Sequence, residues 1–282
     1  MKKFKKSKIK QKKSCVPVQL SMYLDDTKLS SGTAFFFELD GEIFLITNWH
    51  NFSGRRPDNG QPISETTGAT PNKYRIYIPV TNPIEANFSE INYREYTCNL
   101  YKDDDQLYPH WFEHPTFRHK VDLVAVPVND FSLPNMLTIT ANSEKLALSK
   151  LDVRPGMDAF VLGYPIGLSG GAKFPIWKRA SIASEPDIDL NNLPMFYIDT
   201  ATKSGMSGSP VYAQESGFWA PEGKQIPDDA VFGTGHRFIG IYSGRVGDNA
   251  LEAQLGIVWK ESAIIETIQA RVLGRNPLES VK

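Results

Sequence analysis

The chain has 282 residues, of which 41% are hydrophobic and 22% are charged, and its formal net charge is −1. This is the composition of a soluble globular protein, with enough residues for one large domain or two small ones. The near-zero net charge gives no overall reason to expect a nucleic-acid partner, and no segment approaches the roughly 20 apolar residues of a membrane span.

A lysine-rich tail opens the chain. The first thirteen residues contain eight lysines and no acidic residue. Because like charges repel, we expect residues 1–14 to form a disordered, solvated tail. The alternative is a tether to nucleic acid, anionic lipid or an acidic partner, but no aromatic residue besides Phe4 lies among the lysines. The tail has no long apolar stretch behind it and so does not resemble a secretory signal peptide.

Short strands separated by turns account for most of the remaining chain. Apolar alternation predicts these strands, and Asp40-Gly41 predicts a two-residue hairpin turn. Apolar residues at helical spacing predict one helix over residues 260–272. The pattern is typical of an all-β barrel or sandwich that ends in a helix. The predicted strands are residues 16–24, 34–39, 42–47, 74–80, 121–128, 158–163, 174–183, 195–200, 210–213, 238–243 and 254–258.

The strands fall into two groups separated by a loop-like stretch around Pro134. We expect an N-terminal unit over residues 15–130, a linker over residues 131–150, and a C-terminal unit with the terminal helix over residues 151–282. Long loops in compact domains are often functional, so the polar insertions are candidate regulatory surfaces. These insertions are residues 51–73, 83–120 and 214–235.

The number of cysteines indicates whether the protein works in a reducing or an oxidising cellular compartment. The chain has two cysteines, Cys15 and Cys98, which allow at most one disulfide. This scarcity, together with the missing export signal, predicts a reducing compartment, the cytoplasm. Both cysteines are expected to be small buried hydrophobic residues. No group of cysteines and histidines has metal-ligand spacing, so neither a metal nor another cofactor is expected.

Three motifs carry residues suited to nucleophilic catalysis. Ser207 stands between glycines that permit a tight turn, with backbone N–H groups facing a developing negative charge. His50 follows a predicted strand, and imidazole is the natural base at neutral pH. Asp122 opens a buried strand, where a carboxylate needs a partner such as an imidazole N–H. Each motif alone also has a structural interpretation: a Gly/Ser loop, a satisfied histidine or a strand-capping aspartate.

In combination, the order His, Asp, Ser resembles the trypsin/chymotrypsin superfamily of serine proteases. The similarity is greatest to the disulfide-free bacterial trypsin-like peptidases and covers about residues 16–273. The motifs that carry it are SGTAFF at 31–36, TNWH at 47–50, DLVAV at 122–126, LGYPIG at 162–167, GMSGSP at 205–210 and IGIYSG at 239–244.

This resemblance implies a chymotrypsin-like fold of two six-stranded antiparallel β-barrels, with the active site in the cleft between them. By matching position, Ser207 attacks the acyl carbon, His50 takes and returns the proton, and Asp122 orients the imidazole. The three side chains are therefore expected within hydrogen-bond range. The N–H groups of Gly205 and Ser207 are expected to form the oxyanion hole.

The resemblance also assigns the residues that bind the substrate. Ser243 and Gly244 are expected to hydrogen-bond an extended peptide as an added strand. Ala201 and Thr202 stand at the base of the specificity pocket, and neither is charged, so a preference for Lys or Arg is not expected. Glutamyl endopeptidases share a threonine at the position of Thr202 but carry a histidine where this chain has Tyr242. A small or medium uncharged residue is the expected preference.

Met206 departs from the family pattern. Members activated by cleavage carry an aspartate before the nucleophile, which pairs with a new N-terminal amine. Methionine cannot form this ion pair, so we expect no activation by N-terminal insertion, and a chain with the tail deleted up to Ser14 should keep its activity.

Three other interpretations stay open from the sequence. In the first, the protein is a catalytically silent binding or scaffolding module, and its oxyanion hole is collapsed until a partner binds. Alternatively, the chain is an unrelated β-rich interaction domain whose motifs coincide by chance. In the third, the chemistry is retained but a regulatory protein partner controls it through the insertions.

Overall fold

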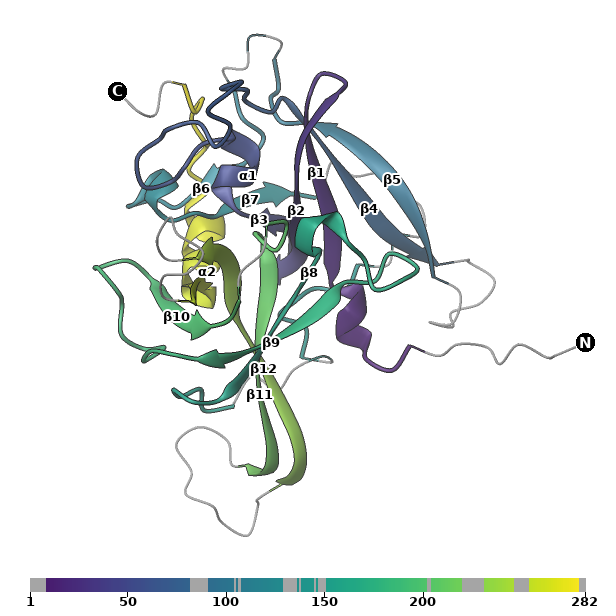
Figure 1. Ribbon diagram of the computed structural model, residues 1–282, viewed down its shortest axis with the longest axis vertical. Helices are drawn as coiled ribbons and strands as arrows, with labels where there is room; N and C mark the ends of the chain where they lie inside the picture. The colour runs from purple at the N-terminus through teal and green to yellow at the C-terminus, as the bar shows by residue number, and fades with distance from the viewer. Residues whose placement is uncertain are drawn as a thin grey trace, which may run out of the picture.

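The computed structural model describes residues 9–81, 91–103, 105, 108–128, 136, 138–144, 146, 151–201, 204–219, 231–245 and 254–278. Two β units are stacked along the long axis of the molecule, and Figure 1 shows the N-terminal unit above the C-terminal one. No helix within these residues is both long enough and apolar enough to cross a membrane.

The N-terminal unit is a seven-stranded antiparallel sheet with the strand order β5-β4-β1-β2-β3-β7-β6. The turn at Asp40-Gly41 joins β2 to β3 as predicted, with Leu39 opposite Glu42. The strands of this unit are β1 (Pro17–Leu24), β2 (Thr27–Leu39), β3 (Glu42–Thr47), β4 (Lys73–Thr81), β5 (Ile91–Asn99), β6 (Phe112–Glu113) and β7 (Val124–Pro127).

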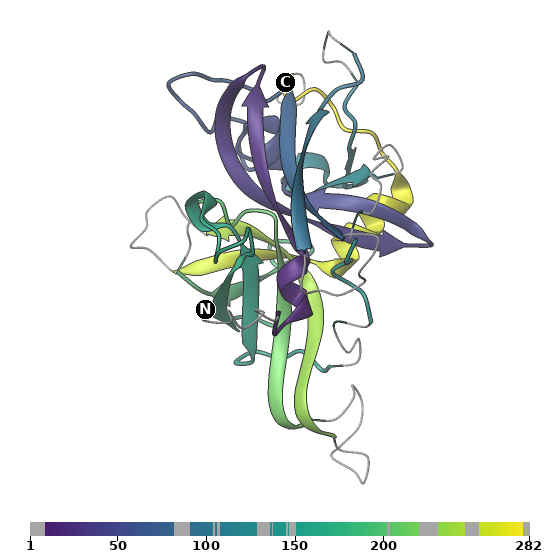
Figure 2. The ribbon, with the colours of Figure 1, turned by 90° about the vertical axis from the view of Figure 1, so that its right-hand side faces the viewer.

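The C-terminal unit is a closed six-stranded barrel in the order β10-β13-β12-β11-β8-β9. Its strands are β8 (Asp158–Gly163), β9 (Ile176–Ile182), β10 (Met195–Asp199), β11 (Ser209–Trp219), β12 (Val231–Arg245) and β13 (Leu255–Lys260). Strands β11 and β12 pair well beyond the residues that β8 and β13 cover, so they continue as a two-stranded hairpin. Figures 1 and 2 show this hairpin projecting from the barrel.

Helical segments among the described residues are η1 (Lys12–Cys15), α1 (Trp49–Ser53), η2 (Arg118–Lys120), η3 (Pro165–Gly167) and α2 (Glu261–Ala270). After α2 the chain returns to the N-terminal unit. There the N–H of Gly274 donates a hydrogen bond to the carbonyl oxygen of Trp111 at 2.9 Å. The C-terminal segment is therefore attached to both units.

In the part of the chain that the structure describes, buried side chains form three core clusters. One fills the N-terminal unit around Trp49 and Phe52, and another fills the barrel. The third lies between the units, where Phe35 and Phe37 of β2 pack against Phe238 of β12 and α2 covers them. Buried apolar area stabilises by roughly 25 cal/mol per Å². This shared core therefore fixes the two units relative to each other, as a site built from both requires.

The prediction of an all-β fold with one C-terminal helix is confirmed. The N-terminal unit has seven strands, whereas apolar alternation identified five and the resemblance implied six. The two additional strands, β5 and β6, form within the insertion 83–120, which looked like a polar loop. Residues 12–15 form η1 and not part of a disordered tail. Lys13 is buried there, and Ser14 Oγ accepts a hydrogen bond from Trp177 Nε1 at 3.0 Å. Most of the predicted linker 131–150 lies outside the described residues.

Candidate active site

His50 and Asp122 are in direct contact, as expected. His50 Nδ1 lies 2.6 Å from Asp122 Oδ2, and the backbone N–H of His50 donates to Asp122 Oδ1 at 2.9 Å. Asp122 is fully buried, whereas 17% of the His50 side chain is exposed. An ionised carboxylate only accepts hydrogen bonds, so Nδ1 carries the proton and Nε2 presents its lone pair.

A strand-turn-helix segment places the imidazole. Strand β3 ends at Thr47, and α1 begins two residues later with His50 in its first turn. Asn48, which precedes α1, does not cap the helix with its side chain. Its Nδ2 instead donates to the backbone carbonyl oxygen of Asp122 at 2.7 Å. This bond ties the start of α1 to the segment leading into β7, so both members of the pair are held by backbone as well as side chain.

Ser207 lies in a tight turn at the entrance to β11, packed against the N-terminal unit. Its carbonyl oxygen accepts a hydrogen bond from the N–H of Thr33 at 2.8 Å, and Thr33 Oγ1 donates to the carbonyl oxygen of Gly205 at 2.9 Å. Gly205 and Gly208 both have φ of +88°, and a Cβ on either would collide with backbone oxygen atoms of Tyr164 or Thr33. The turn therefore requires both glycines, and Gly208 is also required by the close approach of the two units at Thr33.

The expected hydrogen bond between Ser207 and His50 is replaced by one between Ser207 and Ser243. Among the described residues, the hydroxyl of Ser207 donates to the carbonyl oxygen of Ser243 at 3.5 Å, and no hydrogen bond joins it to His50. Ser243 Oγ in turn donates to Asp122 Oδ2. Ser243 thus links all three predicted catalytic residues into one network. Catalytic hydrogen bonds are often long or misaligned without substrate and tighten when substrate binds.

The peptide between Ser204 and Gly205 has a defined orientation. The carbonyl oxygen of Ser204 accepts a hydrogen bond from the N–H of Ile166 in η3 at 2.6 Å. In a trans peptide the N–H points opposite to the carbonyl, so the N–H of Gly205 points away from η3. Ile166 is 68% exposed and has φ of +47°, which is strained for a β-branched residue. Backbone strain is therefore concentrated next to the expected oxyanion hole.

The other residues predicted to bind the substrate differ in how exposed they are. Ala201 is exposed, and Thr202 lies outside the described residues. Tyr242 is buried within the barrel core, and its carbonyl oxygen accepts a hydrogen bond from the N–H of Gly208 at 2.9 Å. Ser243 and Gly244 follow it at the end of β12.

Sequence reasoning missed Glu113, a buried carboxylate behind the histidine. Its Oε1 accepts hydrogen bonds from Trp49 Nε1, Trp111 Nε1 and the backbone N–H of Arg275, each at 3.2 Å. Its Oε2 pairs with Arg118 at 3.1 Å. Because Trp49 immediately precedes His50, Glu113 anchors the helix that carries the imidazole. A single acid in a polar insertion gave no local signal of this role.

A histidine–aspartate pair on one β unit, next to a glycine-bounded serine turn on a second, closed β-barrel, defines the chymotrypsin-type serine proteases. The trypsin-like peptidase domain family model matches residues 32–219, which is more than half of the chain. The chain belongs to this family, and the expected enzyme class, a serine protease hydrolase, is confirmed.

Solved structures of serine proteases are similar in fold at low sequence identity. One is the active form of the Rv3671c protease from M. tuberculosis, at 15% identity and a TM-score of 0.45, covering 92% of this chain and 81% of that one. Another is the HtrA-type protease AlgW with tripeptide, at 14% identity and a TM-score of 0.46, covering 91% and 60%. A third is the thermostable serine protease AL20 from an extremophilic microorganism, at 10% identity and a TM-score of 0.47, covering 92% and 98%. No curated protein matches the sequence.

Proposed function

We propose that this protein is a serine endopeptidase that hydrolyses peptide bonds through an acyl-enzyme on Ser207. The observation that carries the proposal is the hydrogen-bonded network of His50, Asp122, Ser243 and Ser207 at the junction of the two β units. In this mechanism His50 Nε2 accepts the Ser207 proton and later gives it to the leaving amine. Asp122 keeps the proton on Nδ1 and stabilises the imidazolium that forms.

The turn around Ser207 supports an oxyanion hole that is formed before substrate binds. Within the part of the chain that the structure describes, no backbone carbonyl accepts a hydrogen bond from the N–H of Gly205 or of Ser207. Both donors are thus available to a developing oxyanion, and one such donor contributes about 3 kcal/mol to transition-state stabilisation in comparable sites. Met206 between them is buried in the barrel core and holds the turn by apolar packing.

Strand β12 supports binding of an extended peptide. Its pairing with β11 reaches Tyr242 opposite Ser209 and goes no further, while Gly244 and Arg245 still pair with β13 on the other edge. One edge of the strand end at Ser243 and Gly244 therefore has no β11 partner and is available for an added strand. With uncharged Ala201 at the expected pocket base, we propose small or medium uncharged residues on the acyl side of the scissile bond.

Labelling with a fluorophosphonate probe tests the proposal, because only an activated serine reacts. The purified chain should be labelled, and Ser207→Ala and His50→Ala should not be. A library of peptides should then be cleaved by the wild type and left intact by Ser207→Ala. If a folded wild-type chain is neither labelled nor active, the silent-module interpretation is favoured. The hydrogen bond from Ser207 to Ser243, rather than to His50, is the feature that favours that alternative.

The compartment and the control of the enzyme are further parts of the proposal. Cys15 and Cys98 are both free thiols in the structure, and a reducing compartment such as the cytoplasm would keep them so. Labelling of the purified chain without any added protein would show that no regulatory partner is needed for activation.

A further inference from the structure

A strongly basic cavity lies beside the segment that leads to Asp122. It has a volume of about 260 Å³ and is lined by residues 116–120 together with Glu113 and Arg275. Arg118, Lys120 and Arg275 bring three permanent cations to this basic cavity, and Glu113 brings one carboxylate. Its net charge is therefore +2, although the whole chain has a net charge of −1.

The carboxylate of Glu113 already has hydrogen-bond and ion-pair partners of its own. Glu113 is buried and accepts three N–H groups in addition to its ion pair with Arg118. Lys120 and Arg275 form no ion pair within the described residues, and both are exposed to the cavity. The cavity therefore has more positive charge than its own acids can neutralise.

The lining residues are held in place despite their mutual repulsion. Arg118 has φ of +50°, a left-handed conformation that is unfavourable for an L-residue. Its Nη2 donates to the carbonyl oxygen of Leu273 at 2.7 Å, whereas its Nε is buried without a hydrogen-bond partner. Burial lowers the pKa of His119, and Arg118, Lys120 and Arg275 lower it further against the opposing effect of Glu113. An anion in the cavity would relieve this repulsion.

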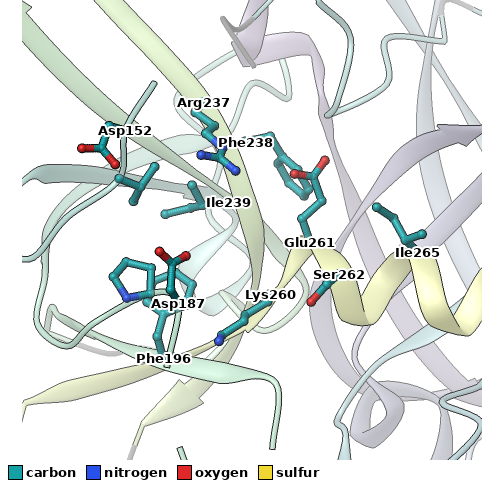
Figure 3. Close-up of a pocket in the computed structure, with 12 residues that line it drawn as sticks. Asp152, Asp187, Phe196, Arg237, Phe238, Ile239, Lys260, Glu261, Ser262 and Ile265 are labelled. Carbon is teal, nitrogen blue, oxygen red and sulfur yellow. The ribbon is translucent and has the colours of Figure 1, made fainter. Parts of the chain in front are cut away.

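A second cavity, at the start of α2, provides a contrast. Figure 3 shows Arg237 and Lys260 sharing this space with Asp152, Asp187 and Glu261. Lys260 pairs with Asp189 at 2.6 Å, and Arg237 donates to the carbonyl oxygen of Leu151 at 3.0 Å. Its acids outnumber its cations, so this cavity has no excess positive charge to offer an anion.

We propose that the basic cavity binds a phosphate-type dianion, either free inorganic phosphate or the phosphate group of a phosphorylated peptide. The charge of −2 matches the +2 of the cavity, and planar guanidinium groups such as those of Arg118 and Arg275 are well suited to bind phosphate oxygens. The ring of His119 packs against that of Trp49 in a tilted arrangement with centroids 5.3 Å apart, and Trp49 precedes His50. The bound group would therefore lie one aromatic ring from the helix that carries the imidazole.

Isothermal titration calorimetry with inorganic phosphate at constant ionic strength tests this site without relying on catalysis. The titration is done near pH 8, where inorganic phosphate is mostly a dianion and a phosphorylated side chain, with a second pKa of about 6, is fully so. We expect saturable binding that Arg275→Gln and Lys120→Gln each weaken about tenfold, the effect of losing one charge-assisted hydrogen bond. Lys28→Gln, which removes an exposed charge from the β1–β2 hairpin, should change nothing.

A second titration with a phosphoserine peptide and its unphosphorylated form identifies the source of the phosphate group. Binding of either phosphate ligand that depends on Arg275 supports the proposal. It is overturned if neither ligand binds saturably, or if Lys28→Gln weakens binding as much as the cavity variants do, which would indicate only general attraction to surface charge. Because Ser207→Ala should bind phosphate like the wild type, loss of protease activity and loss of this site are distinguishable.

Discussion

The hydroxyl of Ser243 donates a hydrogen bond to Oδ2 of Asp122, the same carboxylate oxygen that faces His50 Nδ1. Ser243 lies at the end of a barrel strand, whereas Asp122 belongs to the N-terminal unit, so the bond crosses the junction between the units. The carbonyl oxygen of Ser243 accepts the hydroxyl of Ser207. One residue of the C-terminal barrel therefore contacts both ends of the proposed catalytic network.

Ser243→Ala should lower kcat/KM about tenfold, because the buried carboxylate loses one of its donors while the imidazole keeps its own bond. The backbone carbonyl that meets Ser207 is unchanged in this variant. Steady-state kinetics on a peptide substrate measure the effect, with Ser262→Ala on α2 as an exposed serine control. Wild-type kinetics in Ser243→Ala would show that the bond to Asp122 has no part in orienting the pair.

Asp122→Asn should lower kcat by about 10⁴-fold, since the amide can donate to Nδ1 and hold the imidazole in the wrong tautomer. Folding should survive, because asparagine has nearly the same shape. The kcat of this variant is compared with that of Ser207→Ala, which lacks the nucleophile. Histidine NMR reports which ring nitrogen of His50 carries the proton. A loss of less than tenfold would contradict an orienting role for Asp122.

Glu113→Gln should destabilise the fold by about 3–5 kcal/mol, the cost of breaking a buried ion pair. Glutamine also replaces one carboxylate oxygen by an NH₂ donor, although every partner of Glu113 is itself a donor. Denaturant unfolding measures the loss. Glu266→Gln is the matched control, since Glu266 is half-exposed and pairs only with His114 among described residues. In conditions where Glu113→Gln stays folded, we expect a lower kcat at similar KM, because the helix of His50 is displaced.

The sequence allowed the site to be predicted where its signals are local. The serine turn, the strand-to-histidine segment and the aspartate before β7 each carry their signal within about six residues, and the structure brings all three to one junction. Glu113 was not predictable in this way, because its partners come from Trp49 and Arg275, which are 64 and 162 residues away in sequence. Buried hydrogen-bond networks depend on tertiary contacts that no short motif encodes.

The fold was predicted well in its strands and less well in its insertions. Apolar alternation identified the central strands, but β5 was missed because it lies at the edge of the sheet and has mostly polar, exposed residues. The η1 helix was missed because its lysines suggested a solvated tail. Lys13 is instead buried near Tyr212 of β11, a contact that only the folded chain creates.

Met206→Asp should destabilise the fold by at least about 3 kcal/mol, because it buries a carboxylate without a partner in the barrel core. Met206→Leu, which keeps an apolar side chain of similar volume, should cost less than about 1.5 kcal/mol and is the control. Urea unfolding compares the three chains. If Met206→Asp were instead stable, and gained activity when its N-terminus was trimmed, activation by N-terminal insertion would be open to this fold after all.

Lys13→Met should raise stability at neutral pH by about 1–2 kcal/mol, because it removes a buried amine that pairs with no carboxylate in the described part of the chain. Burial lowers the pKa of Lys13 from 10.5 to about 8. The unfolded chain therefore binds more protons between these values, and wild-type stability should rise as pH increases from about 8 to 10.5. The variant should lack this rise, which unfolding curves at several pH values will show.

The pKa of His236 provides an independent measurement on the Lys13→Met variant. Burial, and then the charge of Lys13, lower the pKa of His236 from 6.5 to about 4, so its contribution to stability is lost as pH falls from 6.5 toward 4. In Lys13→Met the second cause is gone, and the pKa of His236 should move back toward 6.5 without reaching it, because the burial remains. An NMR titration of the His236 ring measures this shift. An unchanged His236 pKa would show that η1 does not hold Lys13 near the barrel in solution.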